Sequence, residues 1–557
     1  MGSNTKEAAD TVTPDAEDIS GYGGVVEKRH AFRAKVEADL YDERYGVTQR
    51  GLKSRHLQMM ALGGTIGTGL FVGSGQALAL GGPAFLFASY IIISLLVFFI
   101  VTAISEVAAY LPAHGGSMSY YGYRYVSSSL GFATGYLYWY SLGILVPYEI
   151  TAASLVIQYW DPEGHISIAV WITVMLVVIV GLNFLPVKFY GESEFWFAGL
   201  KVILLIGLLM LSFILFWGGG PNRQRLGFHY WKSPYPAGKA SLVDGDAGRS
   251  VALLRCVILS AFAFMFAPEL IVIGGGEMES PRRNIPRASR RFFYRLVFFY
   301  ILGTLAITVI CPSDNKALTN GGAGAGSSPF VIGIKNAGIP VLDHIVNAVI
   351  LTSAWSSGNS FLYMSSRSLY SLAVSNNAPS IFKACNRWGL PYMAVGVSSL
   401  FSGLAYLSLG TSSSIVFNWF VNLTNTAGFI SWTCCAIIYF RFRKATKVQG
   451  VEQPYRSHLQ PWGAYIAMTG SMFLVLANGF TVFFPSEWSV SNFFTAYIGI
   501  PAFVVLYVVH RIVFRHEPWM WPPETVDLQT GLEEVLAAEK PERVRDTWWK
   551  KAMIVIE

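Results

Sequence analysis

The chain has 557 residues, of which 53% are hydrophobic and only 13% are charged. A soluble chain of this length carries about a quarter charged residues, so the composition excludes a large soluble protein. The net charge is +7, but the positive residues lie mainly in short loops between apolar runs and form no basic domain, which excludes a nucleic-acid-binding protein. Several apolar runs reach the roughly 20 residues that a helix needs to cross a bilayer, so we expect a multi-pass membrane protein.

The chain divides into a polar tail, an apolar domain and a second polar tail. Residues 1–56 are polar and of mixed charge, as in a cytosolic tail and unlike a cleaved leader. Residues 57–514 hold twelve apolar spans, and residues 515–557 form the second tail. The spans lie near 57–80, 83–111, 130–159, 166–185, 194–217, 252–276, 293–311, 340–373, 391–410, 414–440, 463–485 and 491–514.

The distribution of positive charge predicts how the domain is oriented. The loops after the sixth and tenth spans carry clusters of Arg and Lys, and such loops stay in the cytoplasm. With an even number of spans, both termini are then cytosolic. The loop 218–251 is also positive and disagrees, but it is long, and long loops obey this rule weakly.

The first span opens with the glycine-rich stretch ALGGTIGTGLFVGSG, residues 61–75. Inside a bilayer every backbone N–H and C=O needs a partner, so a helix break is tolerated only where it faces protein or a water-filled cavity. Gly67, Thr68 and Gly69 can form such a break, with free N–H groups for a carboxylate and free carbonyls for an ammonium. The alternative is close helix packing through small residues.

A second interruption favours the break over simple packing. The sixth span reads AFAFMFAPELIVIGGGE, residues 261–277, with Pro268 in its middle. Proline removes one helical hydrogen bond and clashes with the preceding turn. Interruptions in the first and sixth spans indicate an inverted repeat with a substrate site near the midplane of the membrane.

Four ionisable residues stand inside the spans, where each is costly unless it has a partner or a function. Glu269 directly follows Pro268, and we expect it to carry a proton. Lys201 lies in the middle of its span, which argues against a lysine that reaches the membrane surface. Glu149 either binds substrate or pairs with a neighbour, whereas Glu106 lies near the end of a span and is expected to be structural.

Three stretches closely resemble the fungal amino acid permeases, the yeast amino acid transporter family of the amino acid–polyamine–organocation superfamily. They are residues 61–83, 105–139 and 274–288, and the resemblance runs from about 56 to 510. It implies an all-α fold of the leucine-transporter type, with spans one to five and six to ten as inverted repeats and with helices 1 and 6 broken. It also implies proton-driven uptake of amino acids across the plasma membrane by alternating access, with no cofactor or metal.

The resemblance implies roles for particular residues. The first-helix motif would hold the substrate's carboxylate and ammonium, Lys201 would bridge to the first break in place of a sodium site, and Glu269 would couple to protons. Candidate substrate-binding residues are Thr65, Ile66, Gly67, Thr68, Gly69, Phe262, Phe264, Phe266, Ala267, Ser357, Asn359, Thr424 and Asn425. Candidate proton-coupling residues are Glu269, Lys201 and Glu149.

The sixth span departs from the family pattern of aromatic–small–aromatic, one residue, then Gly–x–Glu. When the chain is aligned on Glu269, the run of Phe262, Phe264 and Phe266 is out of step by one residue. The identity of the aromatic gate therefore stays open, and so does the amino acid that is carried. Whether Glu269 or Glu149 carries the proton is also open.

The sequence also bears on two other classes of protein, a receptor and an enzyme, and on the expected partners. A receptor that keeps the permease fold with little flux is the alternative, although 56 residues are few for a signalling tail. An enzyme is disfavoured because no nucleophile–base pair or metal-ligand spacing is found. The expected partners are the amino acid, protons and the lipid bilayer, and a ubiquitin ligase could act on cytosolic Lys28, Lys35 and Lys53.

Overall fold

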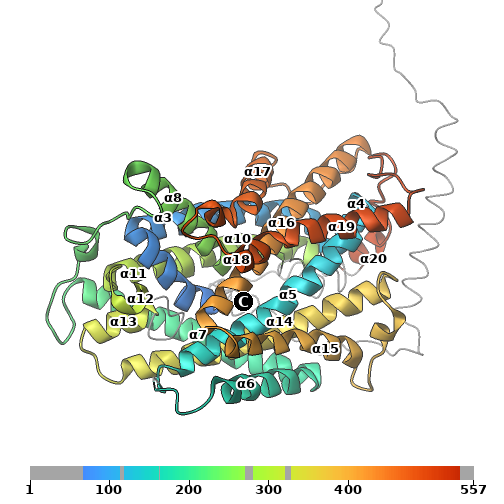
Figure 1. The fold of residues 1–557 in the computed structure, drawn as a ribbon. Coiled ribbons are helices and arrows are strands. Elements are labelled where there is room, and N and C mark those ends of the chain that lie inside the picture. The colour runs from blue at the N-terminus through green and yellow to red at the C-terminus, as the bar shows by residue number, and fades with distance from the viewer. Residues whose placement is uncertain are drawn as a thin grey trace, which may run out of the picture.

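The computed structural model describes residues 67–112, 118–161, 163–269, 272, 280–319, 328–537 and 539. All regular secondary structure in these residues is helical, and the helices pack into one elongated bundle (Figure 1). Seven of the described helices are long and apolar enough to cross a membrane, and one bent pair makes an eighth. The helices α6 (Ile168–Asn183) and α17 (Trp462–Ala477) are also apolar but shorter. The count of twelve spans therefore stays a prediction.

The first two expected spans form one helical stretch with a sharp kink. The π-helical turn η1 (Gly69–Gly73) leads into α3 (Ser74–Tyr110). At Gly82 the backbone leaves helical geometry with φ 80°, a region that glycine enters readily. A Cβ at Gly82 would lie 2.9 Å from the carbonyl oxygen of Ala237, so the close approach of a loop also requires glycine. The kink lies between the predicted spans 57–80 and 83–111.

The remaining long helices overlap the predicted spans, although two of them begin well before the predicted starts at residues 194 and 293. From α4 to η3 they are α4 (Met118–Tyr125), α5 (Ser128–Ile157), α6 (Ile168–Asn183), α7 (Val187–Phe216), η2 (His229–Trp231), α8 (Gly245–Ala261) and η3 (Phe262–Phe264). They continue as α10 (Pro281–Arg295), η4 (Leu296–Ile301), α11 (Leu302–Ile310), α12 (Lys316–Thr319), α13 (Pro329–Asn336) and α14 (Leu342–Val374). The last are η6 (Ser380–Lys383), α15 (Tyr392–Ser399), η7 (Leu400–Leu409), α16 (Ser413–Val448), α17 (Trp462–Ala477), η8 (Phe480–Phe483), α18 (Val490–Tyr497), α19 (Gly499–Val513) and α20 (Leu532–Ala537).

The centre of the bundle is built on α5 and α14, which pack along each other (Figure 1). Around them α3 packs against α8, and α16 packs against α17 and α5. Serine caps define where two of these helices begin. Ser127 accepts a hydrogen bond from the backbone N–H of Leu130 in α5, and Ser412 accepts one from Ile415 in α16. Each cap satisfies a donor that a helix start would otherwise leave free.

The helix α7 has two faces with opposite chemistry. Trp196, Ile203 and Met210 follow one another at seven-residue intervals and are exposed. The opposite face carries Glu194 and Lys201, which are fully buried. An exposed stripe of large apolar side chains is favourable against lipid or another apolar surface, so α7 lies at the periphery of the bundle.

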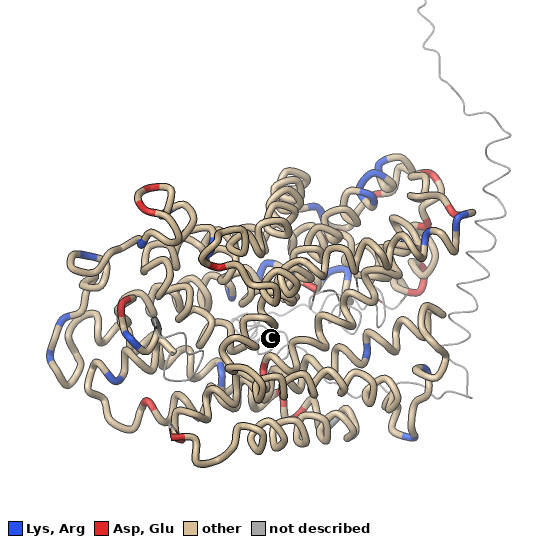
Figure 2. Tube along the Cα trace, viewed as in Figure 1, with Lys and Arg blue, Asp and Glu red and all other residues tan. Residues whose placement is uncertain are grey.

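Charged residues mark the ends of the helices. Figure 2 shows most Lys, Arg, Asp and Glu in loops or near helix termini, with few along the spans. In the loop after α7, Lys239 donates to the carbonyl oxygens of Ala79 at 3.0 Å and Ser313 at 2.7 Å. Burial lowers the pKa of the Lys239 ammonium below its ordinary value. This loop therefore covers the kink of α3 through the carbonyl group of Ala79, which Pro83 cannot bond because it has no N–H.

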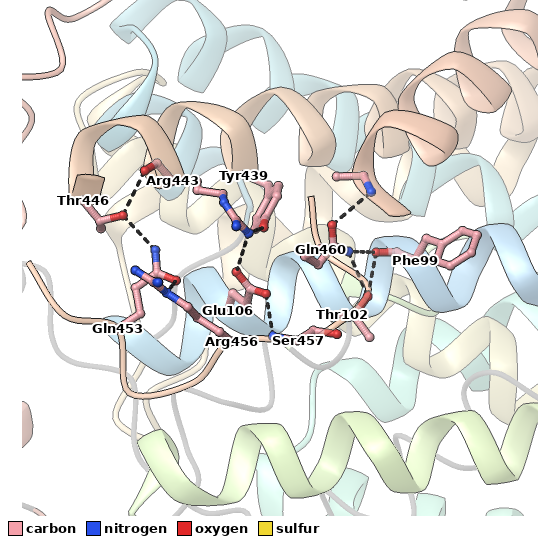
Figure 3. A network of polar contacts seen from close by, with 11 residues as sticks. Phe99, Thr102, Glu106, Tyr439, Arg443, Thr446, Gln453, Arg456, Ser457 and Gln460 are labelled. Carbon is pink, nitrogen blue, oxygen red and sulfur yellow. Dashed lines mark hydrogen bonds and ion pairs between the residues drawn. The ribbon is translucent and has the colours of Figure 1, made fainter. Parts of the chain in front are cut away.

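Glu106 joins three segments at the end of α3 (Figure 3). Its carboxylate accepts a hydrogen bond from the backbone N–H of Ser457 at 2.8 Å and lies 3.9 Å from the guanidinium of Arg443. Nearby, the Gln460 side chain donates to the carbonyl oxygen of Phe99 and to the Thr102 hydroxyl, both at 2.9 Å. The network ties α3 to α16 and to the loop that leads into α17, which is a structural role.

The segment after α19 folds back onto the bundle. Trp521 is buried, and its indole N–H donates to the carbonyl oxygen of Tyr123 at 2.9 Å. Arg124 of α4 donates to the carbonyl oxygens of Asp527 at 2.7 Å and Thr530 at 2.8 Å. The Tyr110 hydroxyl at the end of α3 donates to the carbonyl oxygen of Leu528 at 3.0 Å. The first part of the predicted tail 515–557 is thus docked on α3 and α4.

Candidate substrate site and its buried charges

The turn η1 at the start of the first span lies next to η3, which follows the end of α8. A Cβ at Gly69 in η1 would lie 3.2 Å from the Cα of Ala263 and 3.3 Å from the ring of Phe262, both in η3. The helix α8 ends at Ala261, and after η3 the backbone turns at Met265 and enters the left-handed region at Phe266, with φ 59°. The contact between η1 and η3 brings together parts of the chain that are nearly 200 residues apart.

Gly67 and Thr68 border a buried carboxylate. The Thr68 hydroxyl donates to Glu149 Oε2 at 2.9 Å, and the Tyr148 hydroxyl lies 3.2 Å from the same Thr68 oxygen. A Cβ at Gly67 would lie 3.1 Å from the other carboxylate oxygen of Glu149 and 3.6 Å from the Ser357 hydroxyl. Glycine at position 67 therefore leaves room between α5 and α14, beside the carboxylate.

Lys201 reaches the same place from α7. Its ammonium donates to the Ser357 hydroxyl of α14 at 3.1 Å, and it interacts electrostatically with Glu194 and Glu149. Glu194 accepts a hydrogen bond from the Ser356 hydroxyl at 2.8 Å and is fully buried. Sequence reasoning missed Glu194. Its spacing of seven from Lys201 was the available signal, because residues two helical turns apart lie on one face.

Glu269 lies in a second polar chain that is separate from Lys201. The Ser431 hydroxyl of α16 donates to Glu269 Oε1 at 2.6 Å, and the Tyr138 hydroxyl of α5 lies 2.6 Å from Ser431 Oγ. Either hydroxyl of the Tyr138–Ser431 pair can be the donor, so the chain can pass a proton in both directions. Within the described part of the chain, Glu269 Oε2 has no hydrogen-bond partner.

The three phenylalanines of the sixth span point to different neighbours. The Phe262 ring lies 4.5 Å from the Tyr148 ring, beside Thr68 and Glu149. The Phe264 ring packs on Tyr300 at 4.5 Å, within an apolar cluster. The Phe266 ring meets the edge of Tyr138, near Glu269. Of the three, only Phe262 packs against Tyr148, whose hydroxyl contacts Thr68.

The other candidates lie at varying positions around this centre. The Asn359 side chain accepts a hydrogen bond from Asn183 at 2.7 Å, so its oxygen is already bonded between α14 and α6. The Asn425 amide donates to the carbonyl oxygen of Ile258 in α8 at 3.0 Å. Thr424 and Ala267 are buried, whereas Thr65 and Ile66 lie outside the described residues.

Apolar faces of long helices on the outside and ionisable side chains in the interior define a multi-pass membrane protein with a buried polar site. A family model described as "Amino acid permease" matches residues 56–522. The chain therefore belongs to the amino acid permease family, and its activity is amino acid transport.

Relatives of known name are similar over most of the chain. The proline-specific permease of Emericella nidulans is 46% identical over 517 residues, which cover 91% of this chain and 93% of that protein. The proline-specific permease of Saccharomyces cerevisiae is 48% identical over 501 residues, which cover 87% and 79% respectively. A crystal structure of a manganese transporter mutant from Eremococcus coleocola has a TM-score of 0.49 and 12% identity, over 83% of this chain and 95% of that chain.

Proposed function

We propose that this protein is a proton-coupled transporter that takes up proline across the plasma membrane by alternating access. The substrate comes from the two relatives named as proline-specific permeases, which are 46% and 48% identical to this chain. Among the buried residues near Glu149, Lys201 is the cation that acts on the carboxylate. Because Lys201 already balances the negative charge of Glu149, the site has no further positive charge for an acidic side chain, and it suits a neutral amino acid better.

The observation that carries the proposal is the junction of Gly67, Thr68, Glu149 and Ser357. A carboxylate held by a threonine hydroxyl offers a partner for the amino group of a substrate. Backbone N–H groups at the start of a helix offer partners for the substrate's carboxylate. The contact between η1 and η3 supports a substrate bound between two interruptions, with helices 1 and 6 broken as in the leucine-transporter fold.

We assign the aromatic gate to Phe262. Its ring is in contact with Tyr148, whose hydroxyl lies beside Thr68. A pyrrolidine ring is compact and apolar, and an aromatic face next to a polar junction complements both parts of proline. Thr424 and Asn425, on α16, are the further candidates for contact with the substrate's side chain, and Ser357 is the candidate on α14.

Two buried carboxylates are candidate proton carriers. Glu149 is bonded to Thr68 and lies at the junction, whereas Glu269 is bonded to Ser431 and lies between the sixth span and α16. A proton drives accumulation only if its binding shifts the balance between inward- and outward-facing states. We propose that both carboxylates are needed for coupling, so Glu269→Gln should abolish pH-driven accumulation while retaining some substrate binding.

The remaining features of the proposal concern topology and partners. We propose twelve spans, a five-plus-five inverted repeat and cytosolic termini, with no cofactor or metal. Lys28, Lys35 and Lys53 are proposed ubiquitin acceptors for a ubiquitin ligase, and they lie outside the described residues. Persistence of the protein at the cell surface after all three are changed to Arg would support this role.

The proposal is tested by uptake of radiolabelled amino acids into cells that lack their own permeases, at acidic and at neutral external pH. We expect proline uptake that rises in acid and collapses when a protonophore is added. Glu106→Gln is the control for a buried carboxylate that the structure places in a network at the end of α3. Surface expression without uptake of any amino acid would contradict the proposal and favour a receptor.

A further inference from the structure

Two buried carboxylates share one buried ammonium beside the junction. Glu149 and Glu194 are 2% and 0% exposed, and Lys201 is 1% exposed. The charge of Lys201 acts on both carboxylates. With all three groups ionised, the cluster carries one excess negative charge, which is costly in a medium of low dielectric constant. One carboxylate must therefore bind a proton or face a further cation, such as the amino group of a substrate.

The two carboxylates have different neighbours. Glu149 is bonded to Thr68 and lies against Gly67, so it borders the junction. Glu194 accepts its hydrogen bond from Ser356 of α14, and within the described residues its Oε1 has no hydrogen-bond partner. Glu194 is thus turned toward the α7–α14 interface, whereas Glu149 faces the place where a substrate would bind.

The helix geometry connects Glu194 to Lys201. The two residues are seven apart on α7 and therefore lie on one face, about 10 Å apart along the axis. Helical side chains lean toward the N-terminus of their helix, so the long Lys201 side chain extends back toward Glu194. Ser356 and Ser357, adjacent on α14, each bond one of the two groups. The carboxylate and the ammonium are therefore held by the same turn of a neighbouring helix.

We propose that Glu194 is a positioning residue that serves as the permanent counterion of Lys201. It holds the ammonium at Ser357 and balances its charge, so that Glu149 is left to exchange between a proton and the substrate's amino group. The inference rests on the proposed function, because it assigns separate roles to Glu194 and Glu149 within the same transport site. Without Glu194, Lys201 acts on Glu149 alone and keeps it ionised, so Glu149 still accepts the substrate's amino group but no longer takes up a proton.

Within the described residues, the other titratable groups near Glu194 are few. On its own helix these are Lys201 and Tyr190, whose hydroxyl donates to Ser360 of α14 at 3.2 Å. On α14 the Tyr363 ring stacks on Tyr190, and the Arg367 guanidinium lies 4.4 Å from the Tyr363 ring centre. The sequences of α6 and α11, which also pack against α7, contain no Asp, Glu, His, Lys or Arg. Lys201 and Glu149 are therefore the groups through which a change at Glu194 alters the pH response.

The test compares Glu194→Gln with Glu194→Asp and with Glu163→Gln, the same chemical change at an exposed glutamate between α5 and α6. Purified full-length variants are reconstituted in proteoliposomes at equal protein amounts, and two quantities are measured with labelled proline. These are accumulation driven by a pH gradient and counterflow exchange without one. We expect Glu194→Gln to lower accumulation about tenfold or more and to lose acid stimulation, with counterflow within about twofold of wild type.

Further variants separate positioning from a merely structural role. Glu194→Asp should retain acid stimulation, and Glu163→Gln should behave as wild type. Adding Glu194→Gln to Lys201→Thr should cause no further loss, because a residue that acts through another is non-additive with it. Equal loss of accumulation and counterflow with an unchanged pH profile, or independent effects in the double variant, would overturn the inference. Absence of proton-driven proline transport by the wild-type protein would instead overturn the proposed function.

Discussion

Gly69→Ala tests whether the contact between η1 and η3 is required for transport. The added methyl group would lie 3.2 Å from the Cα of Ala263 and 3.3 Å from the Phe262 ring. These contacts are tighter than ordinary van der Waals contact, and the closest one is with backbone, which cannot move aside by rotating. Overpacking of this kind costs about 1–3 kcal/mol. Since 1.4 kcal/mol is a factor of ten, we expect Vmax/KM for proline to fall by about 5- to 150-fold.

The matched control lies in the same turn. A Cβ at Gly73 would meet nothing within 4 Å, so Gly73→Ala adds the same methyl group without a clash. We expect its Vmax/KM to stay within about twofold of wild type, in keeping with an unclashed substitution. Both variants are measured by initial-rate uptake, normalised to protein at the cell surface. Equal activity of the two variants would refute the reasoning, because it would mean that the close approach of η1 and η3 does not limit transport.

Three further predictions follow from single contacts. Thr68→Val removes the hydroxyl donor to Glu149 and should lower proline uptake about tenfold or more, whereas Thr68→Ser should retain it, as initial rates will show. Phe262→Ala should raise KM for proline, whereas Phe264→Ala, whose ring packs on Tyr300 away from the junction, should lower the melting temperature of the purified protein without raising KM. Trp521→Ala should destabilise the protein by about 3–5 kcal/mol, and an unchanged thermal midpoint would contradict burial of the docked segment.

Much of the fold follows from local properties of the chain. Long apolar runs form helices such as α5, α6 and α16. The ends of these helices lie within a few residues of the predicted spans. The exception is the C-terminal end of α16, which is charged and extends beyond its apolar run. The boundary between the first two spans was predictable because Gly82 precedes Pro83 and both weaken a helix. The docking of the segment after α19 onto α3 and α4 was not predictable. Trp521 and Leu528 lie in a segment without helical periodicity and are buried by residues that are distant in the sequence.

The candidate site was partly predictable. An ionisable residue within an apolar run is visible in the sequence, which is why Glu149, Lys201 and Glu269 were selected. Glu194 was missed because it lies at the polar edge of its run, although its spacing from Lys201 placed it on the same helical face. Which of the three phenylalanines meets the junction could not be decided, because the backbone turn at Phe266 breaks the helical period.

The sequence by itself determined that the chain crosses a membrane many times and buries a few charges, since hydropathy and charge are properties of neighbouring residues. Only the tertiary structure decided which groups meet. Thr68 bonds Glu149 across 81 positions, and Ser431 bonds Glu269 across 162. Such pairs depend on how whole helices pack, and many packings satisfy the same apolar periodicity. The partners of each buried charge are therefore a property of the assembled bundle, where the cost of an unpaired charge selects one arrangement.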